Sequence, residues 1–202
     1  MGSLSTKMFS HTIDCELDWG GRTDGTEGLD KGLPLILKAL KDRNIKALFF
    51  INTEIMEFRP AVIQDIVNDG HEIGIHGHFH TCYKEPWRAH QNMNIARTLL
   101  QGVISQDFFY LRAPKFSYKF YDQVYSDPKN HVSVMKHSWF GGEIKRDPIF
   151  YLHPFDIVGG KNPPNLFCRI WYSKPRMAYE TFIRLLDSFP GNRTLDEDSV
   201  KA

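Results

Sequence analysis

Two histidines, His76 and His80, stand four residues apart in the segment 74–80. At this spacing two imidazoles share one face if the preceding strand turns into a helix, and together they can bind one metal ion. His78 is two residues from each and should point elsewhere. The pair alone fits surface or core histidines equally well, so the metal interpretation depends on the residues that accompany it.

Two carboxylates, Asp14 and Glu16, could complete such a site. Side chains alternate along an extended segment, so both should project to the same side. One carboxylate can ligate a metal while the other takes a proton from water. Two histidines and one carboxylate leave a coordination position open, as a hydrolytic site requires.

Arg112 and His153 each follow an apolar run, at 108–111 and 149–152. An arginine at a strand end needs a carboxylate partner or an anionic ligand, and a structural ion pair is the alternative. A lone histidine at a strand end is usually structural. Beside a hydrolytic metal site, however, His153 becomes a candidate general acid.

The elements that would position these residues alternate between strands and helices. Apolar runs predict strands at 8–14, 46–52, 71–76, 107–112, 132–135 and 149–153, and helical spacing predicts helices at 29–43, 60–68, 87–100 and 179–189. This order indicates the α/β class with a mostly parallel sheet, in which the strand at 46–52 is buried on both faces. Asp14, His76, Arg112 and His153 then lie at carboxyl strand ends, where sites form in such folds.

The composition is that of an ordinary globular chain of 202 residues, with 42% hydrophobic and 24% charged residues. It predicts a single domain over 1–202, with residues 1–7 disordered. A net charge of +1 excludes a basic nucleic-acid-binding surface. No run approaches the roughly 18 apolar residues of a membrane span, so no stable membrane insertion is expected. Three widely spaced cysteines predict free thiols, and the lack of a signal peptide predicts a cytoplasmic location. Nothing in the sequence indicates an oligomeric state.

These motifs, in this order, resemble the polysaccharide deacetylase family, also called the NodB-homology or carbohydrate esterase type 4 family, over residues 8–157. The matching segments are 12–14 (family motif Thr-Phe-Asp-Asp), 46–50 (Lys-Ala-Thr-Phe-Phe), 70–80 (Gly-His-Glu-Ile-Gly and two histidines), 112–114 (Arg-x-Pro) and 152–154 (Leu-His-Pro).

The resemblance implies a deformed (β/α) barrel of about seven strands and a divalent metal, usually zinc. It also implies hydrolysis of an N-acetyl or related acyl group. By the same resemblance Asp14 is the catalytic base, His76 and His80 are metal ligands, His153 is the acid, and Arg112 orients Asp14.

The sequence departs from the family pattern at three places. Cys15 stands where many members have a metal-binding aspartate, so we expect Glu16, at the Asp-x-Glu spacing of other members, to be the third ligand. Cys15 is an alternative thiolate ligand, but strand alternation points it away from Asp14. Gly77 replaces a serine or threonine. No segment matches the fourth motif, whose aspartate tunes the acid histidine, and Glu143 and Asp147 are the carboxylates available between Arg112 and His153.

We therefore expect a metal-dependent hydrolase that removes an acyl group, N-acetyl first, from an amino sugar in a polysaccharide or its precursor. Trp19 could stack on a sugar ring or serve as a lid or core residue, and Arg22 and Pro114 are further candidates for substrate binding. One alternative is a deacylase or deformylase of another small or lipid-linked amide. Another is a catalytically inactive carbohydrate-binding homologue.

Overall fold

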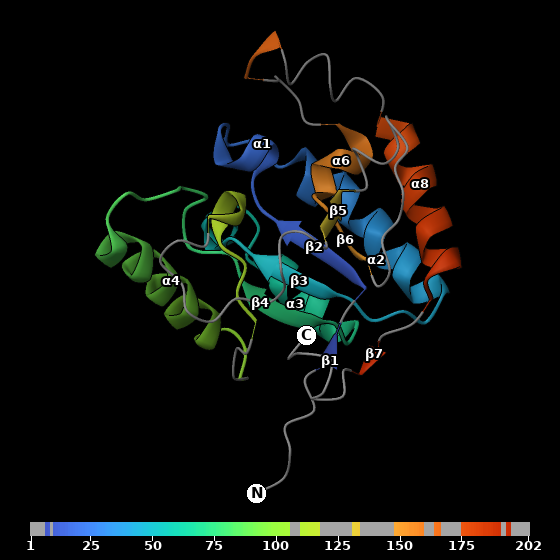
Figure 1. Cartoon of the computed structure of the whole chain (residues 1–202), viewed down its shortest axis with the longest axis horizontal. Helices are drawn as coiled ribbons and strands as arrows, with labels where there is room; N and C mark the ends of the chain where they lie inside the picture. Colours follow the sequence, from blue (N-terminus) through green and yellow to red (C-terminus); the bar gives the residue numbers. More distant parts are fainter. Residues whose placement is uncertain are drawn as a thin grey trace, which may run out of the picture.

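The centre of the molecule is a parallel sheet of five strands in the order β4-β3-β2-β6-β5 (Figure 1). The computed structural model describes residues 7–8, 10–105, 110–117, 131–133, 148–159, 164–166, 175–190 and 193–194. The strands of the sheet are β2 (His11–Cys15), β3 (Leu48–Ile51), β4 (Glu72–Ile75), β5 (His131–Ser133) and β6 (Ile149–Leu152). Leu111 forms a parallel bridge with Ile75 and so extends the sheet beyond β4.

Helices join the strands, as parallel neighbours require. In chain order they are α1 (Asp18–Gly21), the π-helical η1 (Gly28–Gly32), α2 (Leu33–Asp42), the 3-10 turn η2 (Thr53–Glu57), α3 (Ala61–Asn68), α4 (Pro86–Gln101), η3 (Pro114–Phe116), α6 (Pro154–Val158) and α8 (Pro175–Ser188). In Figure 1, α2, α6 and α8 are drawn to the right of the sheet and α4 to its left, and residues of α2, α4 and α8 enter the same apolar cluster.

The core lies between the sheet and these helices. Every residue of β3 is fully buried, which confirms the prediction of a strand covered on both faces. From β2, Ile13 and Cys15 enter the main apolar cluster together with Leu40 of α2 and Phe182 of α8. The alternate residues of β2, among them Asp14, are thereby left to face the other way.

Two glycines let η1 lie directly against the start of α6. A Cβ on Gly32 would be 1.9 Å from the carbonyl oxygen of Pro154, and one on Gly28 would be 2.5 Å from the amide nitrogen of Phe155. Only glycine permits this backbone approach. The contact fixes the loop that follows β2 relative to the residues that follow β6.

The predicted elements are present within the described residues, with shifted ends, except the strand expected at 107–112: residues 107–109 lie outside the described residues, and of the rest Leu111 alone forms a bridge. The strand expected at 8–14 is divided: β1 (Lys7–Met8) pairs antiparallel with β7 (Arg193–Thr194), and β2 belongs to the main sheet. The helix expected at 29–43 begins as a π-helix, and Pro34 lies in the first turn of α2 as expected. No helix in the described part of the chain is long and apolar enough to cross a bilayer.

Candidate metal and catalytic site

Asp14 and Glu16 lie on one face at the carboxyl end of β2, in the middle of the sheet. Both are 2% exposed, and both approach the ring of His76: its Nε2 is 3.9 Å from Asp14 Oδ2 and 3.6 Å from Glu16 Oε2. Cys15, between them, belongs to the apolar core, where burial and then the nearby carboxylates raise the pKa of its thiol well above the ordinary value. A buried, protonated thiol on the opposite face is poorly suited to be a ligand.

His76 follows β4 and continues its ladder, since its amide donates to the carbonyl of Ile51 at 2.9 Å. Its Nδ1 lies 2.8 Å from the carbonyl oxygen of Arg112. A carbonyl only accepts, so the proton is assigned to Nδ1. Nε2 therefore keeps its lone pair and directs it toward the carboxylates of β2.

His80 reaches the same place through a loop, not through the helical turn that the spacing would allow. Residues 76–85 form no helix, and Gly77 has a φ of 86°, outside the helical region. The condition of a helical turn is not met, because the chain is held in the loop by hydrogen bonds, including Phe79 N–H to Asn92 Oδ1 at 2.8 Å. His78 turns away, as expected, and pairs with the hydroxyl of Thr53.

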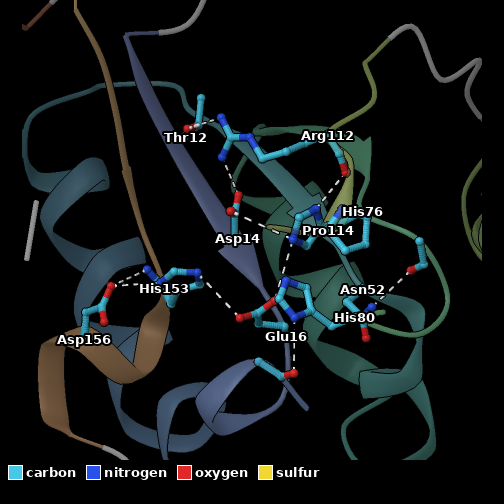
Figure 2. Close-up of polar contacts among 12 residues, drawn as sticks. Thr12, Asp14, Glu16, Asn52, His76, His80, Arg112, Pro114, His153 and Asp156 are labelled. Carbon is cyan, nitrogen blue, oxygen red and sulfur yellow. Dashed lines mark hydrogen bonds and ion pairs between the residues drawn. The ribbon is translucent and has the colours of Figure 1, made fainter. Parts of the chain in front are cut away.

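The ligand atoms of Glu16, His76 and His80 all lie within 4.8 Å of one another. His80 Nε2 is 3.1 Å from Glu16 Oε2, and Figure 2 shows both imidazoles directed at this carboxylate. Among the described residues, neither Glu16 Oε2 nor His76 Nε2 has a hydrogen-bond partner, although both are buried. Buried polar atoms left open in a group of two imidazoles and one carboxylate fit a divalent cation, with positions free for other ligands.

Arg112 fixes Asp14 in place. It is fully buried, and its guanidinium donates to Asp14 Oδ1 through NH1 and to Thr12 Oγ1 through NH2, with its charge 4.1 Å above the ring of Phe50. Burial alone would raise the pKa of Asp14, but Arg112 and, more weakly, His76 and His153 outweigh it and hold the pKa below its ordinary value. The second carboxylate oxygen, Oδ2, remains directed toward the candidate metal centre (Figure 2).

His153 enters from the opposite side, at the end of β6 beside β2. Its Nε2 lies 3.5 Å from Glu16 Oε1, while its Nδ1 and its main-chain amide both donate to Asp156 Oδ2, at 3.0 and 2.9 Å. Burial alone would lower the pKa of His153, but Asp156 and Glu16 outweigh it and raise the pKa to about 10. The imidazolium is then present at neutral pH and can give up a proton.

Asp156 is a candidate functional residue that the sequence analysis missed. The carboxylate was expected before His153, at Glu143 or Asp147, and both positions lie outside the described residues. The available signal was a helix start: His153 is the N-cap of α6, Pro154 follows, and Asp156 closes a capping box at N3.

The three residues predicted to bind substrate are placed differently from one another. Trp19 is 7% exposed and packs on Phe155, whose ring stacks on that of His153 with the centroids 4.9 Å apart. The indole of Trp19 therefore supports His153 through Phe155 more than it faces a ligand. Arg22 is exposed. Pro114 is buried, and its carbonyl accepts from the thiol of Cys82 at 3.5 Å. Their substrate contacts stay predictions.

The sequence and the fold were compared with those of known proteins. A model of the polysaccharide deacetylase family matches residues 24–125, while no curated protein matches the chain. Among solved structures, the peptidoglycan deacetylase PdaC from Bacillus subtilis is 15% identical, with a TM-score of 0.58 over 90% of this chain and 84% of that one.

Two further structures have the same fold. A family 4 acetyl xylan esterase from Clostridium thermocellum, in complex with a cobalt ion, is 18% identical, with a TM-score of 0.57 over 88% of this chain and 84% of that one. A CE4 family pseudoenzyme from Bacillus anthracis is 16% identical, with a TM-score of 0.58 over 91% and 62%. At these identities the likeness establishes the fold, which is the predicted α/β deformed barrel.

Proposed function

The chain belongs to the polysaccharide deacetylase family, and from that premise we propose that it is a divalent-metal-dependent hydrolase that removes an acyl group from an amino sugar. The acyl group we expect first is N-acetyl. The observation that carries the proposal is the group formed by Glu16, His76 and His80: each imidazole is tied to a backbone carbonyl through Nδ1, so that both Nε2 atoms face one buried carboxylate.

Glu16, His76 and His80 would hold the cation. When bound, a divalent ion supplies Lewis-acid chemistry: it polarises an acyl carbonyl and makes water a better nucleophile. The residue set suits zinc and also suits cobalt or another transition metal, since nitrogen and oxygen donors bind all of them. Zinc remains our expectation.

Asp14 would act as the base. Its Oδ1 is occupied by Arg112, which leaves Oδ2, on the side of His76, to accept a proton from water. Arg112 acts through Asp14 and is a positioning residue, because its guanidinium is fully buried and contacts Asp14, Thr12 and neighbouring aromatic rings.

His153 would act as the acid on the leaving nitrogen. Its Nε2 is directed into the site from the side opposite Arg112, and Asp156 holds both its backbone and its ring (Figure 2). A general acid is needed because an amine leaves poorly as an anion, and such a residue typically contributes about 100- to 10,000-fold to the rate.

The second candidate function is that of an inactive carbohydrate-binding homologue. It remains a candidate because this chain has the same fold as a pseudoenzyme. Its support in the sequence was the altered first motif and the lack of a fourth-motif aspartate. In the described site Glu16 stands in reach of both histidines, and Asp156 supplies a carboxylate to His153. Both departures thus have a compensating residue, which favours the enzyme.

The experiment is a substrate panel. Zinc- or cobalt-loaded protein is incubated with N-acyl amino sugars in free, nucleotide-linked and lipid-linked form, and released acetate and formate are measured. We expect acetate release that is lost on chelation and in the Asp14→Asn variant. Binding of sugars without release of any acyl product would favour the inactive homologue, and formate release alone would favour the deformylase.

A further inference from the structure

The ring of His80 is directed by the main chain behind it. Its Nδ1 lies 3.2 Å from the carbonyl oxygen of Gly20, and its Nε2 lies 3.1 Å from Glu16 Oε2. Both the carbonyl and the carboxylate can only accept, so when Nε2 binds a cation the proton of the neutral ring lies on Nδ1 and is directed at the carbonyl. The position of one carbonyl therefore sets both the tautomer and the direction of this ligand (Figure 2).

Gly20 can make this contact only as glycine. Trp19, Gly20 and Gly21 adopt successive positive φ values of 63°, 71° and 67°, which fold the chain back over His80. A Cβ on Gly20 would be 2.9 Å from His80 Nδ1 and 3.4 Å from Glu16 Oε1. The first distance is too short for any carbon, so a larger residue would displace the imidazole.

Asp18 anchors this part of the chain from the inside. It is fully buried, and its carboxylate accepts from the amides of Gly28 at 2.9 Å and Glu27 at 3.1 Å. Its own amide donates to the carbonyl of Gly25 at 2.9 Å. A buried carboxylate is costly unless its oxygens are hydrogen-bonded, and these bonds join the two ends of the segment 18–28.

We propose that the segment 18–28 is a positioning loop for the candidate metal centre, in which Asp18 holds the loop closed and the Gly20 carbonyl aims His80 at the cation. The inference rests on the proposed metal site and deepens it, since it names the part of the chain that sets the geometry of one ligand. Asp18 and Gly20 act through His80 and touch neither substrate nor metal. A carbonyl behind a ligand histidine fixes its tautomer and raises its basicity.

The adjacent glycines provide a matched test. Gly20→Ala and Gly21→Ala both place an alanine at a positive φ, but a Cβ on Gly21 stays 3.9 Å from His80 and meets only the end of the Glu54 side chain, at 3.3 Å. Titration with Co²⁺, followed by visible absorption, should give about 10- to 100-fold weaker binding and an altered spectrum for Gly20→Ala. Gly21→Ala should bind and absorb like the wild type. Thermal unfolding of both variants checks that the backbone strain is equal.

A second pair of variants tests the anchor. In Asp18→Asn one oxygen is replaced by a donor that faces an amide N–H, so the loop should loosen and Co²⁺ affinity should fall, whereas Asp24→Asn, an exposed change in the same loop, should have no effect. In Zn²⁺-loaded protein, nitrogen NMR should find the proton of His80 on Nδ1 in the wild type, and the Nδ1 resonance should shift in Gly20→Ala.

Equal affinities and spectra for Gly20→Ala and Gly21→Ala would overturn the role of Gly20 while leaving the metal site intact. Wild-type affinity in Asp18→Asn would overturn the anchoring role alone. Failure of the wild-type protein to bind Co²⁺ at all would overturn the proposed metal site as well.

Discussion

A single oxygen, Asp156 Oδ2, accepts hydrogen bonds from both the main-chain amide and the ring Nδ1 of His153. The backbone bond starts helix α6 and the ring bond aims Nε2 at the site, so one carboxylate couples a helix N-terminus to the orientation of the candidate acid. This coupling makes Asp156 a positioning residue in the proposed mechanism.

Asp156→Asn should lower turnover of an amide substrate by about 10-fold or more, because the neutral side chain removes the negative charge that raises the pKa of His153. The loss should be much smaller on an activated acyl ester, whose leaving group needs no proton. Asp65→Asn, an exposed change on α3, serves as control. A merely structural role would lower both rates equally, and that result would remove Asp156 from the mechanism.

The third metal ligand is assigned to Glu16 and not to its neighbour Cys15, and substitutions can distinguish the two. Glu16→Gln should weaken cation affinity by about 10-fold or more, since it removes the charge of a first ligand. Cys15→Ala should retain the cation and should act on stability instead, because the thiol lies in the apolar core. Isothermal titration with Zn²⁺ measures both variants. If Cys15→Ala loses the cation and Glu16→Gln keeps it, the third ligand is the thiolate.

The division of labour between Asp14 and His153 can be tested with the leaving group. Asp14→Asn and His153→Ala should each lose about 100- to 10,000-fold in turnover of an amide and still bind the cation. On an activated ester His153→Ala should recover much of its rate, whereas Asp14→Asn should not, because water must be activated in both reactions. Recovery in both variants, or in neither, would mean that the roles are assigned wrongly.

Much of this site could be predicted because it follows from strand geometry. Alternation along β2 places Asp14 and Glu16 on one face and Cys15 on the other, and the apolar run of β3 identifies a central strand. Parallel strands bring their carboxyl ends to one edge, so residues far apart in sequence, such as Asp14 and Arg112, meet there.

What could not be predicted depends on loops. The spacing of His76 and His80 fits a helix, but the loop is set by distant partners such as Asn92, which no local pattern reveals. Asp156 was overlooked because the family order directs attention to residues before His153. Trp19 was considered for a sugar contact, and its packing against Phe155 depends on the close approach of η1 and α6.

Two buried histidines outside the site predict a pH dependence of stability. Burial lowers the pKa of His11 to about 4, partly offset by its bond to the Phe189 carbonyl, and burial with the charge of Lys46 lowers the pKa of His71 to about 4. The unfolded chain takes up these protons near pH 6.5, so stability is full above that pH. It falls by up to about 1.4 kcal/mol per pH unit per histidine as the pH drops from 6.5 toward 4.

Urea unfolding at pH 7 and pH 5 measures this loss. His71→Asn should reduce the difference between the two pH values, and His90→Asn, a change at an exposed position on α4, should leave it unchanged. Equal losses in the wild type and His71→Asn would show that His71 is not a source of the acid sensitivity.

The central claim is that Glu16, His76 and His80 together hold one divalent cation, and the metal content of the purified protein tests it most directly. Wild-type protein dialysed against limiting Zn²⁺ should retain a single cation per chain, and the double variant His76→Ala/His80→Ala should retain none while keeping its fold by circular dichroism. A double variant that still binds a full equivalent of Zn²⁺ would contradict the site, and with it the proposed chemistry.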